Sequence, residues 1–118
     1  MLYGAKDIKG LKVITITNGP VNAADIRKMG DQLRDRFPNI VAVLAATAEN
    51  KATMLVVCGK NAVARGVKAG DLIKTITKIC DGTGGGKPDS AMGGCKNLLK
   101  LDDAMAAVDD FVNDNAKD

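Results

Sequence analysis

The sequence contains no histidine and very few aromatic residues. Of its 118 residues none is His, and only Tyr3, Phe37 and Phe111 are aromatic. Without His, the chain lacks the commonest general base, the commonest metal ligand and both the Ser-His and Cys-His nucleophile pairs. Without aromatic platforms, it lacks the base-stacking surface of typical single-strand nucleic-acid binders. These absences argue against a self-contained enzyme, and we expect no catalytic residue in this chain.

The cysteines form no metal-ligand or redox motif. Cys58, Cys80 and Cys95 are far apart, and no Cys-x-x-Cys pair is present, so we do not expect a zinc or redox site. Cys58 and Cys80 each end an apolar stretch and are predicted to be buried, whereas Cys95 adjoins a glycine-rich run and is a candidate for exposure. Free thiols, no signal peptide and no apolar run of membrane-spanning length favour a cytoplasmic protein without membrane contact.

The size and the charge pattern indicate one domain with a basic middle. Length and a 46% hydrophobic content predict a single globular domain over residues 1–118. The first predicted strand begins close to Met1, which suggests an excised fragment of a longer protein. Residues 59–100 carry eight basic and three acidic residues, whereas residues 101–118 carry one Lys and six Asp. The basic middle favours an anionic partner, although an ordinary solvated lysine surface would look the same.

Apolar patterning predicts an α/β fold. Residues 11–17 are rich in β-branched side chains, and residues 40–46 and 53–58 are continuous apolar runs; all three are predicted strands, and the last two are expected to pair as an antiparallel hairpin around Glu49-Asn50-Lys51. Helical spacing predicts three helices: from a cap at Asn22 to Pro38, from about Lys68 to Cys80, and from Leu101, with residues after Asn113 fraying. We expect a small mixed sheet of three to four strands covered by about three helices, with a Gly-rich loop before the last helix.

That Gly-rich run spans residues 82–94 and is the most informative feature of the chain. Six of its thirteen residues are Gly, which suits a backbone that takes positive φ angles or one that another backbone approaches closely. No nucleotide motif fits. Asp81 occupies the first glycine position of a P-loop and Pro88 its hydroxyl position, while Lys87 interrupts Gly-x-Gly-x-x-Gly. Two interpretations remain: glycine N–H groups that cradle an anion beside Lys87, or glycines chosen for close packing.

The same run resembles a signature near the C-terminal end of bacterial alanyl-tRNA synthetases. The stretch GTGGGKPDSAMGG is similar to the pattern G-K-G-G-G-[RK]-P-D-x-A-x-x-G-G, and the resemblance covers about residues 5–113. Thr83 stands where that signature commonly has a basic residue. The wider family is the domain that follows the catalytic core of DHH-type phosphoesterases, whose Gly-Gly-His loop is absent here.

The resemblance implies an accessory domain that binds tRNA. In that family the domain contacts the outer corner of the tRNA and helps the aminoacylation and editing sites share one tRNA(Ala). The implied partners are tRNA(Ala), the upstream aminoacylation and editing domains, and a second subunit of a homodimer. ATP and zinc are implied only for the upstream domains of an alanine–tRNA ligase. The residues expected to bind nucleic acid are Gly84, Gly85, Gly86, Lys87 and Asp89 in the run, with Lys60, Arg65 and Lys96 extending the basic surface.

Two other functions remain open. One is the substrate-binding domain of a DHH-type phosphoesterase, which the domain encoded upstream would identify. The other is a structural or oligomerisation domain with no nucleic-acid role, which would form a concentration-dependent dimer indifferent to tRNA.

Overall fold

The computed structural model describes residues 6–8, 10–18, 23–48 and 51–116. Its strands form one six-stranded sheet, with four α-helices and one short 3₁₀ helix around it. In chain order the elements are β1 (Lys6–Ile8), β2 (Leu11–Asn18), α1 (Ala23–Arg36), β3 (Ile40–Ala48), β4 (Lys51–Cys58), α2 (Lys60–Ala64), α3 (Ala69–Ile79), β5 (Thr83–Gly86), β6 (Ser90–Cys95), η1 (Leu98–Lys100) and α4 (Leu101–Asn115).

The sheet is mixed, and its two most apolar strands lie at its centre. The strand order is β1-β2-β3-β4-β6-β5. β2 and β3 are parallel and are joined by α1, whereas every other neighbouring pair is antiparallel. The pairing of Leu44 with Leu55 belongs to the predicted β3–β4 hairpin. This confirms the α/β class and the mixed sheet.

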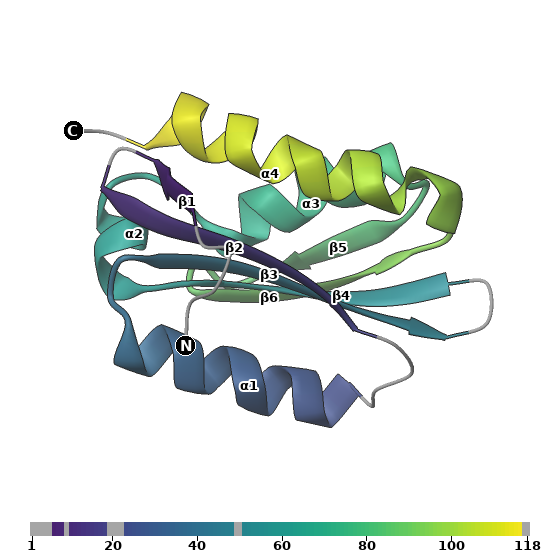
Figure 1. Cartoon of the computed structure of the whole chain (residues 1–118), viewed down its shortest axis with the longest axis horizontal. Coiled ribbons are helices and arrows are strands. Elements are labelled where there is room, and N and C mark those ends of the chain that lie inside the picture. Colours follow the sequence, from purple (N-terminus) through teal and green to yellow (C-terminus); the bar gives the residue numbers. More distant parts are fainter. Residues whose placement is uncertain (1–5, 9, 19–22, 49–50, 117–118) are drawn as a thin grey trace.

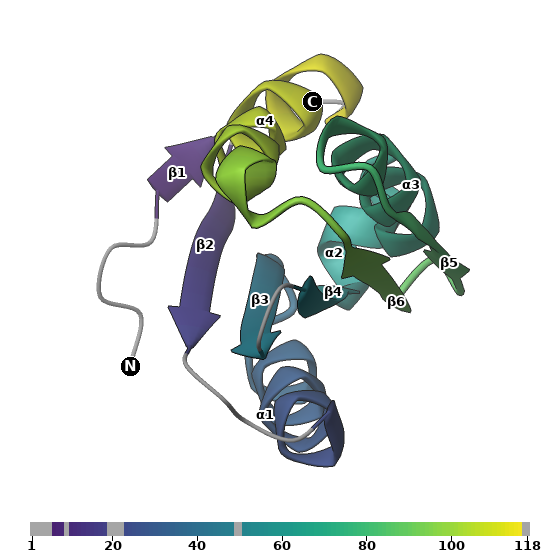
Figure 2. The same ribbon diagram turned by 90° about the vertical axis from the view of Figure 1, so that its right-hand side faces the viewer.

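Helices cover both faces of the sheet (Figures 1 and 2). α1 packs against β3 and β4 on one face, where Ile26 joins Leu44 and Leu55 in a buried cluster. α3 and α4 cover the other face, and their apolar residues form the larger core with β4 and β6. The aliphatic side chains of the two central strands are therefore buried on both sides, as continuous apolar runs require. No described helix is long and apolar enough to cross a membrane.

The helices confirm the predicted periodicity with small differences at their ends. α1 stops at Arg36, just before Pro38, and α3 runs within the predicted 68–80 segment. The Asn22 cap and the Glu49-Asn50 turn lie outside the described residues. α4 continues through Asn115, so the expected fraying after Asn113 is wrong: the next residue, Ala116, is buried against the core. The five-residue helix α2 was not among the predicted elements.

The predicted size of the sheet is too small, because three strands were not recognised. β1 is a three-residue edge strand, too short to carry a periodic signal. β5 and β6 make up most of the Gly-rich run, which folds as an antiparallel hairpin rather than a loop. Glycine is depleted in strands because it adds no packing side chain and loses much entropy, so its presence argued against this assignment.

The hairpin explains the glycines by close packing. A Cβ on Gly82 would lie 1.7 Å from the carbonyl oxygen of Gly94, and one on Gly84 would lie 2.8 Å from Cγ1 of Ile73 in α3. Among the described residues the positive φ angles belong to Gly10, Gly66 and Asp81, none of them a glycine of the hairpin. Close approach therefore accounts for Gly82, Gly84, Gly86 and Gly93, whereas Gly85 and Gly94 have room for a Cβ. Positive φ accounts for none of the six.

Candidate nucleic-acid interface

The turn of the β5–β6 hairpin is held in place by three backbone hydrogen bonds. Within the turn, the N–H of Lys87 donates to the carbonyl oxygen of Ser90 at 3.0 Å. The carbonyl of Pro88 accepts from Ala69 N–H at 2.7 Å, and that of Asp89 accepts from Cys58 N–H at 3.0 Å. The turn is therefore tied both to the start of α3 and to the end of β4, which fixes the direction in which its side chains project.

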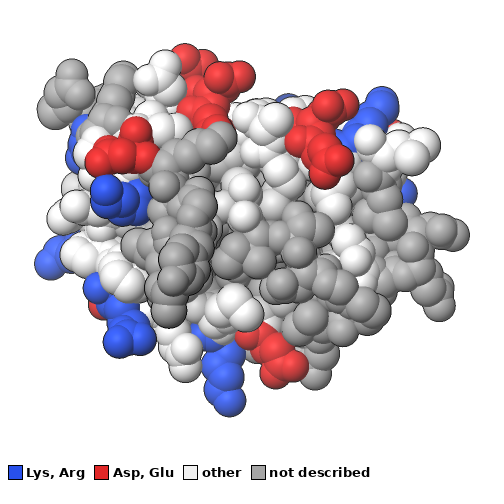
Figure 3. All heavy atoms as spheres, in the orientation of Figure 1, with Lys and Arg blue, Asp and Glu red and all other residues white. Residues whose placement is uncertain are grey.

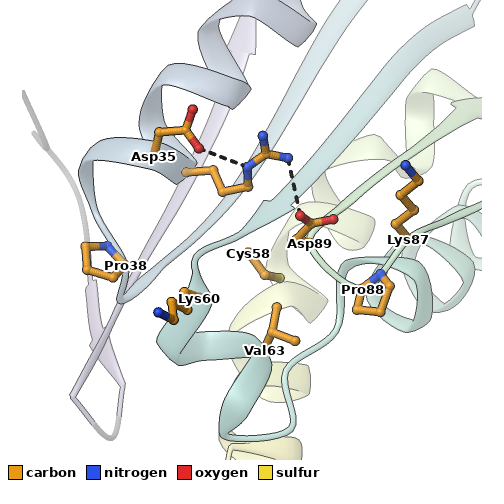
Figure 4. Close-up of a pocket in the computed structure, with 9 residues that line it drawn as sticks. Asp35, Pro38, Cys58, Lys60, Val63, Lys87, Pro88 and Asp89 are labelled. Atoms are coloured by element: carbon orange, nitrogen blue, oxygen red, sulfur yellow. Dashed lines mark hydrogen bonds and ion pairs between the residues drawn. The ribbon is translucent and has the colours of Figure 1, made fainter.

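Two open hollows flank this turn. The first, which we name the α2 hollow, has a volume of about 670 Å³. In the view of Figure 4, Cys58 and Val63 lie between its two lysines. It is lined by the end of α1 (Arg34, Asp35, Pro38), by Cys58, Lys60 and Val63, and by the turn (Lys87, Pro88, Asp89). Its lining therefore combines charged and apolar side chains.

The second hollow, named the α1 hollow, lies between α1 and the hairpin and has a volume of about 580 Å³. Its lining combines Arg27, Asp31 and Arg34 of α1 with Gly85, Gly86, Lys87, Asp89, Ser90, Ala91 and Met92 of the hairpin. The two hollows share three lining residues, Arg34, Lys87 and Asp89. We name the combined surface the hairpin cleft.

Arg34 links α1 to the hairpin at the centre of this cleft. Its guanidinium lies 3.4 Å from a carboxylate oxygen of Asp35, 3.6 Å from one of Asp31 and 3.6 Å from one of Asp89. Figure 4 draws the contacts with Asp35 and Asp89 as dashed lines. The Arg34 side chain is only 25% exposed. Arg34 is thus engaged by three carboxylates, and its charge is not available to a ligand without exchange of a partner.

The free positive charge of the cleft comes from other residues. Arg27, Lys60 and Lys87 are exposed, and no ion pair holds any of them in the described part of the chain. Lys87 lines both hollows, so its flexible ammonium group can contact a ligand in either of them. An exposed ammonium on a fixed turn is suited to pair with phosphate as a point charge.

The structure gathers some of the predicted binding residues and separates others. Lys60, Lys87, Asp89, Gly85 and Gly86 all line the hairpin cleft. Three others lie elsewhere: Gly84 borders a third hollow formed with Lys74 and Lys78 of α3, Arg65 lies beside Gly10 of the β1–β2 turn, and Lys96 follows the far end of β6. At about 3.3 Å per strand residue, Lys96 is roughly 20 Å from the turn.

Arg27 and Arg34 were not among the binding residues predicted from the sequence. Both belong to the polar side of α1, and polar residues on one side of a helix usually indicate no more than a solvated face. No sequence signal distinguishes them, because only the pairing of β4 with β6 brings the hairpin next to α1.

The glycine N–H groups do not form the concave cradle considered from the sequence. Gly84, Gly85 and Gly86 are extended and pair with Gly93, Met92 and Ala91 of β6. A concave nest needs successive residues of alternating handedness, and this stretch has none. Among the strands that the structure describes, β5 pairs with β6 alone and forms one edge of the sheet, and α3 packs against it.

The three thiols are buried structural groups. Burial raises the pKa of Cys58 to about 12, with a further contribution from the Asp89 carboxylate. Burial also raises the pKa of Cys80 to about 12, together with its contact to the Cys95 thiol. Cys95 itself is buried, so its expected exposure is wrong. Enclosed thiols are poor nucleophiles. No group of three metal-binding side chains occurs among the residues described.

Comparisons with known proteins agree on the family. The family model described as the DHHA1 domain matches residues 10–114. An alanine–tRNA ligase of Dehalococcoides mccartyi is 38% identical over 108 residues, and that of Sorangium cellulosum is 41% identical over 111 residues. Each match covers 92% of this chain and 12% of the relative, so the chain spans a small part of the proteins that it matches.

A solved structure shares the fold. The crystal structure of the C-Ala domain from Aquifex aeolicus alanyl-tRNA synthetase matches with a TM-score of 0.86 at 23% identity, covering 92% of this chain and 97% of that one. At that identity the likeness establishes the fold alone. Together, these findings confirm the resemblance to alanyl-tRNA synthetases that the Gly-rich run indicated. The chain therefore belongs to the DHHA1 domain family and has the fold of the C-Ala domain of alanyl-tRNA synthetase.

Proposed function

We propose that this chain is a tRNA-binding domain of an alanyl-tRNA synthetase and that its hairpin cleft contacts the tRNA backbone. The observation that carries the proposal is the placement of Lys60 and Lys87. Both are exposed, both border the α2 hollow, and neither has an ion pair in the described structure. Lys87 also projects from a turn that two other elements hold in place. Cations presented in this way lower the free energy of a nearby phosphate backbone.

The charge distribution favours one side of the molecule for the polyanion. α4 carries five Asp and no basic residue, and Figure 3 shows acidic side chains gathered along the top of the molecule, over α4. The hairpin cleft, by contrast, is lined by four basic and three acidic residues, and all three carboxylates contact Arg34. We therefore propose that RNA approaches the cleft and not the α4 layer.

The proposed target is duplex-like RNA, as at the outer corner of tRNA(Ala). Such RNA is read by its shape, phosphates and 2′-hydroxyl groups, which does not require stacking on aromatic side chains. In a full-length ligase this contact would help the aminoacylation and editing sites act on one tRNA. The phosphoesterase alternative has less support, since the curated relatives reported above are named as alanine–tRNA ligases.

The test compares two lysines on opposite ends of β6. The affinity of this chain for tRNA(Ala) is measured over a salt series for the wild type, Lys87→Ala and Lys96→Ala. We expect Lys87→Ala to weaken binding and to lower the slope of log K against log salt by roughly 0.7–1, which is the loss of one phosphate contact. Lys96→Ala, matched in charge but roughly 20 Å from the turn, should change neither quantity by as much. An unchanged slope and affinity for Lys87→Ala would remove the hairpin turn from the interface.

A further inference from the structure

The turn that presents Lys87 also presents a carboxylate. Asp89 lies two residues after Lys87, and its side chain is 50% exposed and borders both hollows. Its carbonyl oxygen is bound by Cys58 N–H at 3.0 Å, and the preceding carbonyl by Ala69 N–H at 2.7 Å. The backbone on either side of Asp89 is therefore anchored, so the carboxylate is held at a defined place in the cleft.

Within the described part of the chain, only one oxygen of this carboxylate has a partner. Oδ2 lies 3.6 Å from a guanidinium nitrogen of Arg34, which is longer than a good hydrogen bond. Among the residues that the structure describes, Oδ1 makes no hydrogen bond or ion pair. An ionised carboxylate can accept about four hydrogen bonds, so Asp89 retains most of its acceptor capacity and directs it to the cleft.

A half-exposed carboxylate beside Lys87 is unfavourable for phosphate alone. Its negative charge repels a phosphate brought to the ammonium group. The repulsion is offset when the same ligand carries a hydrogen-bond donor for the carboxylate. RNA carries such a donor, the ribose 2′-hydroxyl, next to the phosphate on every nucleotide, and DNA does not. A cation and a carboxylate two residues apart on one fixed turn match this pair of groups.

We infer that Asp89 is a specificity-determining residue, which accepts a hydrogen bond from a ribose 2′-hydroxyl while Lys87 pairs with a neighbouring phosphate. This inference rests on the proposed function and goes further, because it names the chemical group that the cleft requires. The competing account gives Asp89 only a structural role, as a partner of Arg34. A structural role changes the affinity for every ligand alike, whereas an acceptor role changes the preference for the 2′-hydroxyl.

The experiment measures that preference directly. One probe is an RNA stem-loop, and the other is the same stem-loop with 2′-O-methyl groups, which keeps the A-form helix and removes the donors. Affinities are measured by fluorescence anisotropy for the wild type, Asp89→Ala, Asp89→Asn and Asp35→Ala. Asp35→Ala is the matched control, because Asp35 also contacts Arg34 and borders the α2 hollow but belongs to α1. Thermal melting of each variant checks that it is folded.

We expect the wild type to bind the RNA about three- to tenfold more tightly than the methylated form, as one net hydrogen bond allows. Asp89→Ala should reduce this ratio to about one, chiefly by weakening the RNA complex. Asp89→Asn, which keeps an acceptor oxygen, and Asp35→Ala should both retain a ratio above one. A steric clash of the methyl groups would lower the affinity of every variant by the same factor, so the dependence of the ratio on residue 89 is the readout.

Two results would overturn the inference: a wild-type ratio of one, or an Asp89→Ala ratio equal to that of the wild type, as when Asp89→Ala binds both probes equally more tightly. In each case, binding that still depends on Lys87 would leave the proposed function standing. If the wild type binds neither probe, the inference fails, and if it also does not bind tRNA(Ala), the proposed function fails with it.

Discussion

The carbonyl oxygen of Pro88 accepts a 2.7 Å hydrogen bond from the backbone N–H of Ala69, the first residue of α3. The first N–H groups of a helix have no partner within the helix, and here the hairpin turn supplies one. The contact ties the turn to the first turn of α3. It also means that this N–H already has a partner within the protein, so the proposed phosphate contact at the hairpin cleft would depend on side chains rather than on this N–H.

Hydrogen exchange of two amides tests this anchoring. We expect the N–H groups of Ala69 and Cys58 to exchange much more slowly than that of Asp71, which lies on an exposed residue of the same first turn. The physical reason is that both donate to carbonyls of the hairpin turn and belong to buried residues. Exchange is followed by NMR at neutral pH. Ala69 exchanging as fast as Asp71 would show that the turn is not docked on α3.

Substitution of two hairpin glycines should have contrasting effects on stability. A Cβ at position 82 would lie 1.7 Å from the Gly94 carbonyl oxygen, whereas one at position 85 would lie 3.6 Å from Cε of Lys74, an ordinary contact. We expect Gly82→Ala to lower the free energy of unfolding by about 1–3 kcal/mol or more through overpacking. Gly85→Ala should change it by no more than about 0.5 kcal/mol. Urea unfolding of both variants measures the difference.

The pair is informative because the chemical change is identical. Both glycines belong to the same run, so loss of glycine flexibility alone would affect the two variants similarly. Equal stability of Gly82→Ala and Gly85→Ala would contradict the close approach of the backbone at Gly82.

Most of the fold could be predicted because its central elements carry strong local patterns. β3 and β4 are continuous apolar runs, and α3 and α4 have regular apolar stripes. β5 and β6 could not be predicted in this way. Gly84 and Gly93 satisfy a tertiary requirement, the close passage of backbone beside Ile73, whereas glycine by itself signals a loop. The run was recognised as important, but its conformation was decided by packing.

The candidate site was only partly predictable, for a related reason. Lys87 and Asp89 stand out within a distinctive motif, and both line the cleft. Lys60 lies with them, whereas Arg65 does not, although both are isolated cations in the sequence. What separates the two is their place in α2: Lys60 begins the helix at the cleft, and Arg65 caps its other end. Sequence reasoning identifies cations, but the sheet topology decides which of them converge.

The thiol of Cys58 should affect stability at high pH. Burial raises its pKa to about 12 in the folded protein from an ordinary value of 9.0. Between these two values the unfolded chain has lost the thiol proton and the folded chain has kept it, so stability decreases as the pH rises from about 9 to 12. Below about pH 9 this contribution is fully present. One thiol can lower the free energy of unfolding by up to about 1.4 kcal/mol per pH unit in this range. We expect Cys58→Ala to abolish that contribution.

The measurement is the urea unfolding free energy of the wild type and of Cys58→Ala as a function of pH. The absolute stability of the variant will be lower because of the cavity, so only the slopes are compared. A thiol reagent gives an independent check: Cys58 should react slowly in the folded protein and quickly in urea. Parallel slopes together with fast native-state labelling would show that this thiol is not buried.

The central claim, that the hairpin cleft is the surface that meets RNA, is tested most directly by mapping lysine protection. The folded protein is acetylated briefly with and without tRNA(Ala), and the modified lysines are quantified by mass spectrometry. Four exposed lysines can be acetylated in the free protein, so protection by tRNA can be measured at each: Lys60, Lys87, Lys96 and Lys100. We predict that tRNA protects Lys60 and Lys87 and leaves Lys96 and Lys100 reactive. Protection of Lys96 and Lys100 with Lys60 and Lys87 unprotected would contradict the account.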